Sequence, residues 1–215
     1  MDNGDKQPNS KFIVFEGIDG SGKTTQIKLL QMALTNQGIV SSISAEPTSL
    51  PSGIEIRKIL AGEQEKNPLE IAKLFTLDRI AHNTDKTRGI EKMLNDKITV
   101  ISDRYYYSSM AYQGAHTGID QIIEMNINNP NIRRPDLCIF LDLTPEQSME
   151  RIKSSRDSFE IFETPEILCQ TRDMFYKVIK RMRGLGDNIV TIDASREVEE
   201  VSKDILATVL DIYNE

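Results

Sequence analysis

The segment Phe12-Ile-Val-Phe-Glu-Gly-Ile-Asp-Gly-Ser-Gly-Lys-Thr-Thr25 carries the strongest structural signal in this chain of 215 residues. It fits G-x-x-x-x-G-K-[ST], the pattern of a phosphate-binding loop. The fixed positions are filled by Gly17, Gly22, Lys23 and Thr24. An apolar, β-rich run precedes the loop, and apolar residues at helical spacing from Ile27 to Leu34 follow it. The pattern therefore lies between a predicted strand and a predicted helix, as such a loop requires.

The chemistry of such a loop follows from its residue types. Glycines let backbone N–H groups approach phosphate oxygens, and the helix N-terminus adds partial positive charge. The lysine reaches the β- and γ-phosphates, and the hydroxyl after it binds magnesium. An ordinary glycine-rich turn is the alternative, but a turn has no need of a Lys-Thr pair at this place. We predict an ATP site formed by Gly17, Ile18, Asp19, Gly20, Ser21, Gly22, Lys23, Thr24 and Thr25.

Composition predicts one α/β domain. The chain has 39% hydrophobic and 27% charged residues, which is typical of a soluble globular protein. The net charge of −7 argues against a nucleic-acid surface, and no apolar run is long enough to span a membrane. Residues 1–10 are polar, show no secretory signal and are predicted to be a disordered tail before a single domain over 11–215. Cys138 and Cys169 match neither a disulfide framework nor a metal site, so we expect a cytoplasmic location.

Short apolar segments predict strands that are buried on both faces of a parallel sheet. These segments are Phe12–Phe15, Ile39–Ser44, Ile98–Ser102, Leu137–Leu143 and Asn188–Ile192. Helical patterns occur between and after them, at Ile54–Leu60, Pro68–Asn83, Thr84–Asn95, Ile119–Asn126, Pro145–Lys153, Pro165–Arg183 and Val198–Tyr213. Thr144 and Thr164, each followed by proline, are good N-cap residues. The alternation predicts an α/β fold with helices on both faces of the sheet.

Charged residues follow the predicted strands, at the sheet edge where open α/β folds bind ligands. Glu46-Pro47 follows the second strand, and Asp103 and Arg104 end the third. Asp103 is a candidate magnesium ligand, and Arg104 offers a planar fork that matches phosphate oxygens. A surface ion pair would also produce this pattern. His82 and His116 have no visible partner in the sequence, and we assign them no chemistry.

The sequence alone leaves open the role of two further groups of residues. Arg151, Lys153 and Arg156 form either a cationic lid for phosphoryl transfer or a solvated helix end. Phe75 and Arg79 are four residues apart, so they share one helix face. A ring and a guanidinium could hold a flat heterocycle between them, although the pattern alone favours a core Phe75 and a solvated Arg79.

Together these motifs resemble the thymidylate kinase family over residues 11–213. The resemblance is carried by Phe12 to Gln26, Glu46-Pro47, Leu74-Phe-Thr-Leu-Asp-Arg79, Ser102-Asp-Arg-Tyr105, Ser108-Ser-Met-Ala-Tyr-Gln-Gly-Ala115, Arg134-Pro-Asp-Leu137 and Leu141-Asp-Leu-Thr-Pro145. Many kinases share the phosphate loop, whereas the other motifs in this order are much more specific. The resemblance implies a P-loop kinase fold with a five-stranded parallel sheet and a short lid at about residues 153–163. It also implies transfer of a phosphoryl group from ATP to dTMP, with magnesium, to give dTDP.

The resemblance implies contacts to the base and sugar of dTMP. Phe75 would stack on thymine, and Arg79 would hydrogen-bond it. Ser109 falls at a position that contacts the base, and Gln113 lies near it. Tyr112 would crowd the 2′ position and so favour deoxyribose.

On the phosphate side, the resemblance implies that Arg57 and Arg104 hold the acceptor phosphate, with Pro47 in the same pocket. Asp19 would contact the 3′-hydroxyl group of the acceptor. Asp103, together with the hydroxyl of the phosphate loop, would hold magnesium.

The catalytic cations predicted in this way are Lys23, Arg104 and a lid arginine. Some members of the family carry a catalytic arginine in the phosphate loop, where this chain has Gly20. Members without it supply the arginine from the lid, so Arg156 becomes the candidate. Arg151 is expected at the ATP site.

A second departure concerns the loop around Glu46-Pro47. Many bacterial members have arginine before this pair and two glycines after it, whereas this chain has Ala45 before and Thr48-Ser49 after. The resemblance therefore leaves the conformation of this loop open.

Two other functions would account for part of these motifs. A deoxynucleoside kinase shares several of these motifs, but it needs a base near the 5′-hydroxyl and has no use for Arg57 and Arg104 on an acceptor phosphate. A nucleotide-binding switch would lack an acceptor pocket.

The resemblance further implies a homodimer, for which Leu69–Ile80 and Ile90–Leu94 offer apolar faces. It implies dTMP and ATP as ligands, and neither nucleic acid nor membrane as a partner.

Overall fold

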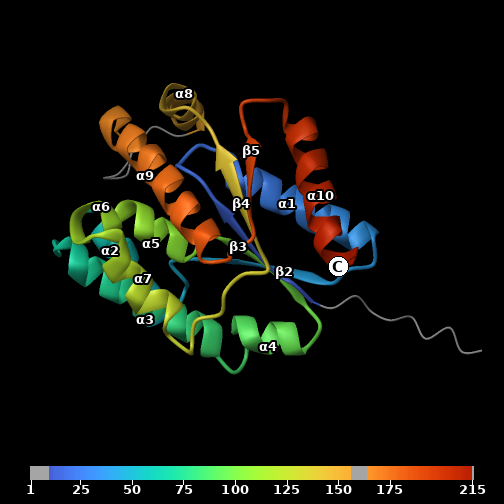
Figure 1. The fold of residues 1–215 in the computed structure, drawn as a ribbon, viewed down its shortest axis with the longest axis horizontal. Helices are drawn as coiled ribbons and strands as arrows, with labels where there is room; N and C mark the ends of the chain where they lie inside the picture. The colour runs from blue at the N-terminus through green and yellow to red at the C-terminus, as the bar shows by residue number, and fades with distance from the viewer. Residues whose placement is uncertain (1–9, 156–163, 215) are drawn as a thin grey trace, which may run out of the picture.

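The computed structural model describes residues 10–155 and 164–214. These residues form a five-stranded parallel sheet in the order β2-β3-β1-β4-β5 (Figure 1). The strands are β1 (Phe12–Glu16), β2 (Ser41–Ala45), β3 (Thr99–Asp103), β4 (Leu137–Asp142) and β5 (Ile189–Asp193). Each strand overlaps its predicted segment, so the predicted parallel α/β fold is confirmed. Residues 1–9 of the predicted tail lie outside the described residues.

Helices connect the strands throughout the described part of the chain. They are α1 (Lys23–Asn36), α2 (Pro51–Leu60), α3 (Pro68–Thr84), α4 (Ile90–Asn95), α5 (Tyr106–Tyr112), α6 (Gly114–Thr117), α7 (Ile119–Ile127), α8 (Pro145–Ser155), α9 (Pro165–Gly184) and α10 (Val198–Asn214). The two predicted N-caps are confirmed, because Thr144 Oγ1 accepts the N–H of Gln147 and Thr164 Oγ1 accepts that of Ile167, both at 3.3 Å. In the described ranges, no helix is both long and apolar enough to cross a membrane.

The predicted helix Thr84–Asn95 is wrong over its first half. The carboxylate of Asp85 accepts the backbone N–H groups of Thr87 and Arg88 at 2.8 and 2.7 Å. An aspartate that binds the backbone two residues on makes a turn in place of a helix. Helix α4 consequently begins only at Ile90.

Helices α5 and α6 were missed by the sequence analysis. The three consecutive residues Tyr105, Tyr106 and Tyr107 give no helical period, yet all three are buried. Tyr106 and Tyr107 both donate to Asp187 Oδ2, at 3.1 and 2.8 Å. The helix is stabilised by this tertiary contact with the connection between α9 and β5, which local sequence does not encode.

The core consists of two layers, one on each face of the sheet (Figure 1). Phe12 and Val14 of β1 belong to the cluster formed with α3, α5, α7 and α9. Ile13 and Phe15 belong to the cluster formed with α1 and α10. Neighbouring side chains of a strand point to opposite faces, so a strand covered on both sides must be apolar throughout. This requirement explains the continuous apolar runs of β1 and β4. Strand β2 lies at the edge of the sheet, contains three serines and is only partly buried.

Strand β1 is central, so the loop that follows it lies between the ends of its two neighbours. Phe15 is paired with Asp103 of β3 and with Ile139 of β4. Ala45, at the end of β2, is also paired with Asp103. The carboxyl ends of β1, β2 and β3 therefore bring the phosphate loop, Glu46 and Arg104 to one edge of the sheet.

Replacement of Phe140 by alanine tests this two-layer core. Phe140 is buried, and its ring centroid lies 5.2 Å from that of Phe175 in α9. We expect Phe140→Ala to lower the free energy of unfolding by about 3–5 kcal/mol, because the surrounding residues cannot fill the cavity. Urea unfolding monitored by circular dichroism measures this loss. Met32→Ala, at a side chain of α1 that is 64% exposed, is the control and should change stability by less than about 0.5 kcal/mol. Equal effects of the two variants would contradict the assignment.

Candidate active site

The phosphate loop is closed tightly against the sheet and α8. Gly17 has φ +149°, and a Cβ there would lie 2.7 Å from the carbonyl oxygen of Leu141. Gly20 has φ +74°, and a Cβ there would lie 2.8 Å from the carbonyl oxygen of Ser148. These positions demand glycine because other residues rarely adopt this backbone and would collide with it. The backbone thus has no room at Gly20 for the loop arginine to which the resemblance pointed.

Lys23 is buried beneath this loop. Its ammonium group donates to the carbonyl oxygens of Gly17 and Ile18, at 3.1 and 3.2 Å. Burial, followed by the nearby charge of Arg104, lowers the pKa of Lys23 below its ordinary value. The amine is therefore held across the loop by two neutral acceptors. Within residues 10–155 and 164–214, no carboxylate forms a salt bridge with it, which leaves its charge for an anion.

The pair expected to hold magnesium comes together in the structure. Thr24 Oγ1 donates to Asp103 Oδ2 at 3.3 Å, at the ends of α1 and β3. A hydroxyl and a carboxylate are oxygen ligands of the kind that magnesium prefers, and the ion usually completes its shell with waters and substrate phosphates. Among the described residues, no cluster of three His, Cys, Asp or Glu side chains forms a separate metal site. The residues therefore fit a magnesium ion that arrives with a phosphate ligand.

Two adjoining pockets open at this edge of the sheet. The first, the loop pocket, is lined by Gly20, Gly22, Lys23, Thr24, Thr25, Ala45, Asp103 and Arg151. The second, the aromatic pocket, is lined by Leu60, Ala61, Phe75, Arg79, Tyr105, Ser108, Ser109, Tyr112 and Gln113. Both are also lined by Asp19, Glu46, Pro47, Arg57 and Arg104. The shared residues make the two pockets parts of one continuous site.

The structure brings the predicted site residues together. All nine residues predicted to bind dTMP line the aromatic pocket: Asp19, Pro47, Arg57, Phe75, Arg79, Arg104, Ser109, Tyr112 and Gln113. Of the residues predicted for ATP, Gly17, Ile18 and Ser21 belong to the phosphate loop but do not line the loop pocket. Arg156 and the rest of the predicted lid from 156 to 163 lie outside the described residues.

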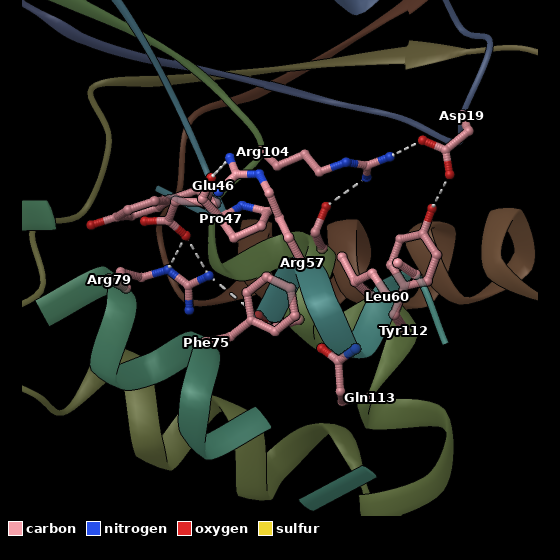
Figure 2. Close-up of a pocket in the computed structure, with 14 residues that line it drawn as sticks. Asp19, Glu46, Pro47, Arg57, Leu60, Phe75, Arg79, Arg104, Tyr112 and Gln113 are labelled. Atoms are coloured by element: carbon pink, nitrogen blue, oxygen red, sulfur yellow. Dashed lines mark hydrogen bonds and ion pairs between the residues drawn. The ribbon is translucent and has the colours of Figure 1, made fainter. Parts of the chain in front are cut away.

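Arg104 lines both pockets, and Figure 2 shows its guanidinium pointing toward Asp19. Its guanidinium forms an ion pair with Asp19, donates to Ser108 Oγ at 2.9 Å and lies 5.4 Å from the ring centroid of Tyr112. Tyr112 in turn donates to the second carboxylate oxygen of Asp19 at 3.4 Å. Burial alone would raise the pKa of Asp19, but the charges of Arg104 and Lys23 lower it below the ordinary value. Asp19 is therefore an anion that orients both Arg104 and the tyrosine ring.

Arg79 is buried, which corrects the expectation of a solvated side chain. It is 0% exposed and forms a salt bridge with Glu46 at 2.6 Å. Other N–H groups of its guanidinium donate to Asn126 Oδ1 at 2.5 Å and Ser109 Oγ at 3.2 Å. Figure 2 shows the ring of Phe75 projecting into the aromatic pocket beside Arg79. Phe75 and Arg79 therefore both face the aromatic pocket and not bulk solvent.

The expectation that His82 lacks a partner is also wrong. Its Nδ1 lies 3.0 Å from Glu46 Oε1, and its Nε2 makes a hydrogen bond with Ser44. Glu46 therefore lies between a histidine and Arg79, which hold its two carboxylate oxygens. Sequence spacing could not reveal this cluster, because Glu46 and Arg79 are 33 residues apart in the chain.

Gln113 offers a hydrogen-bond acceptor to the aromatic pocket. Its side chain is buried, and its Oε1 atom has no hydrogen-bond partner among the described residues. A buried amide oxygen without a partner is costly unless a ligand satisfies it. Its place in the pocket wall therefore favours a ligand that carries an N–H group.

The loop after β2, whose conformation the sequence left open, is held by a buried carboxylate of α3. Asp78 accepts from the N–H and the hydroxyl of Thr48, at 2.7 and 2.6 Å, and from Ser52 Oγ at 2.7 Å. Arg57 donates to the carbonyl oxygens of Pro47 and Thr48. Of the residues that depart from the common pattern, Thr48 therefore supplies contacts that fold this loop, and the carbonyl oxygens of the loop hold Arg57 at the rim of both pockets.

Comparison with known proteins identifies the family. A sequence profile described as thymidylate kinase matches residues 15–205. The chain belongs to the thymidylate kinase family. It is 42% identical to a probable thymidylate kinase of Methanococcus aeolicus over 94% of this chain and 97% of that protein. It is 35% identical to a thymidylate kinase of Leptospira interrogans over 91% of each chain, and 32% identical to a probable thymidylate kinase of Thermococcus kodakarensis over 95% of this chain and 99% of that protein.

Glu16 supports the site from beneath, and the sequence analysis gave it no role. It ends β1 and is only 1% exposed. Its carboxylate accepts the N–H groups of Tyr105 and Ser108, at 2.8 and 3.2 Å, and the hydroxyl of Ser108 at 2.6 Å. Burial raises its pKa from 4.5 to about 7, although Arg104 opposes this shift. Only the Glu-Gly pair at the start of the phosphate loop could have pointed to it.

The raised pKa of Glu16 predicts how stability depends on pH. A carboxyl group whose pKa is higher in the folded state binds more protons there, so its contribution to stability is lost as pH rises from 4.5 to about 7. Glu16→Gln keeps the shape but cannot ionise. We therefore expect the variant to gain stability relative to the wild type between about pH 5 and about pH 8. Urea unfolding at both pH values measures this difference, and a difference that does not change with pH would contradict the prediction.

Proposed function

We propose that this protein is a thymidylate kinase that transfers the γ-phosphoryl group of ATP to dTMP and forms dTDP, on the route to dTTP. The observation that carries the proposal is the pair of adjoining pockets with Arg57 and Arg104 on their common rim. Phosphoryl transfer requires donor and acceptor phosphates to meet in line and their charge to be neutralised. Two guanidinium groups at the junction of the pockets meet that requirement for an acceptor that carries a phosphate.

The aromatic pocket fits a thymine base and a deoxyribose. The ring of Phe75 would stack on the base, and N–H groups of Arg79 and the free oxygen of Gln113 would pair with its polar edge. Tyr112 is oriented by Asp19 and would lie against the sugar. Asp19 would accept a hydrogen bond from the 3′-hydroxyl group.

The loop pocket fits the polyphosphate of ATP. Backbone N–H groups of the loop and the ammonium of Lys23 would hold its β- and γ-phosphates. Thr24 and Asp103 would hold magnesium, which when bound neutralises charge on the phosphates. Lys23 and Arg104 would stabilise the charge that develops on the transferred group, with Arg156 proposed as the lid cation. The acceptor phosphate is already a nucleophile, so the chain needs no strong base.

The alternative of a deoxynucleoside kinase is less well supported. Such an enzyme needs a carboxylate that can take a proton from the 5′-hydroxyl. Glu46 lines both pockets, but it is 4% exposed and its oxygens are held by Arg79 and His82. A carboxylate fixed in this way positions Arg79 and is poorly placed as a base. The presence of an acceptor pocket likewise argues against a nucleotide-binding switch.

We further propose a single kinase domain over 11–215 that acts as a cytoplasmic homodimer. Leu77 of α3 and Ile54 of α2 are exposed apolar side chains on helices that pack together. These side chains would become buried if α3 packed against its copy in a second chain.

An acceptor screen tests the proposed function. With ATP and magnesium, a coupled assay of ADP formation should show turnover with dTMP and far less with thymidine, because only dTMP offers a phosphate to Arg57 and Arg104. Turnover with thymidine that equals or exceeds turnover with dTMP would contradict the proposal and favour the nucleoside kinase.

Lys23→Ala tests the role of the phosphate loop. We expect kcat to fall by at least about a hundredfold, since one preorganised donor to developing charge contributes on this scale. The circular dichroism spectrum should be unchanged. Activity retained within a few-fold of the wild type would contradict the assigned role.

Glu46→Gln separates the two possible roles of Glu46. If the carboxylate positions Arg79, the variant should raise KM for dTMP by about tenfold, the loss expected for one charge-assisted hydrogen bond, and change kcat less. If Glu46 is instead a general base, kcat should fall steeply with little change in KM. Steady-state kinetics with dTMP as the varied substrate distinguishes these outcomes.

A further inference from the structure

The carboxylate of Glu16 joins the strand of the phosphate loop to the helix that lines the aromatic pocket. Glu16 lies immediately before Gly17, the first glycine of the loop. Its Oε1 atom accepts the N–H groups of Tyr105 and Ser108, and Tyr105 is the N-cap residue of α5. Tyr105 makes no side-chain cap of its own. Glu16 therefore satisfies the N–H of Tyr105 at the start of α5, and it shares the N–H of Ser108 with the carbonyl oxygen of Tyr105.

The second oxygen of Glu16 continues this connection to Arg104. Ser108 donates its hydroxyl proton to Glu16 Oε2 at 2.6 Å, and the same hydroxyl oxygen accepts from Arg104 at 2.9 Å. The side chains of Arg104, Ser108 and Glu16 thus form a chain of hydrogen bonds, and the donor and the acceptor of each bond are fixed. The hydroxyl of Ser108 can accept from Arg104 in this geometry because its own proton is held by the carboxylate.

Both the backbone and the side chain of Arg104 are fixed before a ligand binds. Arg104 has φ +69°, a conformation that residues with a side chain rarely adopt. Its N–H donates to the carbonyl oxygen of Phe15, so its position is tied to β1. An arginine has many rotamers, and ordering it at a binding site costs conformational entropy. Contacts from Asp19, Ser108 and the ring of Tyr112 restrict it before a ligand arrives.

We propose that Glu16 is a positioning residue for the acceptor phosphate, which acts through Ser108 to orient Arg104. The inference rests on the proposed function, in which Arg104 holds that phosphate. Glu16 touches neither substrate in this arrangement. Its role is to make the arginine of the acceptor site and the loop of the donor site parts of one hydrogen-bonded unit.

Binding of two ligands that differ only in the phosphate tests the proposal. Calorimetry would compare dTMP with thymidine for the wild type, Ser108→Ala and Glu16→Gln, each with the full chain. Ser108→Ala removes the hydroxyl between the carboxylate and Arg104. Glu16→Gln keeps an oxygen for the two backbone N–H groups but turns a donor toward Ser108. We expect each variant to weaken dTMP binding by about tenfold, as for a lost charge-assisted hydrogen bond, and thymidine binding by less than about twofold.

Ser109→Ala is the matched control, because its hydroxyl accepts from Arg79 and not from Arg104. This variant should weaken both ligands alike, since it acts on the base side of the pocket. In the Arg104→Ala background, Ser108→Ala should have no further effect on dTMP binding. If the role of Glu16 is merely structural, each variant should change the dissociation constants of dTMP and thymidine by the same factor, and their ratio should stay constant.

The outcomes separate this inference from the proposed function. If the wild type does not bind dTMP, the proposed function fails. If the wild type binds dTMP but Ser108→Ala and Glu16→Gln leave the ratio of dTMP to thymidine affinity unchanged, the proposed function stands and the role of Glu16 is overturned. An effect of Ser108→Ala that persists in the Arg104→Ala background would also overturn it.

Discussion

The site rests on the central place of β1 in the sheet. Because β3 and β4 flank β1, the loop after β1 has Arg104 and Asp103 on one side and α8 on the other. The carbonyl oxygens of Leu141 and Ser148 approach Gly17 and Gly20 so closely that only glycine fits. The shape of the phosphate cradle is therefore set by backbone packing, and the side chains that carry charge are arranged around it.

Charge in this site is balanced within the protein before any ligand arrives. Arg104 is paired with Asp19, Arg79 with Glu46, and Lys23 is held by carbonyl oxygens. Preorganised charges of this kind cost little to rearrange when phosphates bind, and they act strongly where water is excluded. The two arginines differ in their place: Arg104 is partly exposed on the rim of both pockets, where it can face a phosphate. Arg79 is buried and anchored by Glu46, Asn126 and Ser109.

Much of the fold could be predicted because its signals are local. The inner strands β1 and β4 are short apolar runs, and the phosphate loop is a contiguous motif. The loops at the carboxyl ends of the strands then placed Glu46, Asp103 and Arg104 at one edge of the sheet by topology alone, whereas Phe75, within α3, was placed there only by the resemblance. What could not be predicted depends on residues that are distant in the chain. Glu16 and Ser108 are 92 residues apart, and the burial of Arg79 depends on Glu46 and Asn126, so no periodicity or spacing reveals either cluster.

The central claim is that the loop pocket and the aromatic pocket are the donor and acceptor halves of one site. A compound that joins adenosine to thymidine through a polyphosphate chain tests it most directly. The account predicts that this compound competes with both ATP and dTMP and binds more tightly than either, since linking two ligands makes the second binding event intramolecular. Competition with ATP alone, at an affinity no greater than that of ATP, would contradict it.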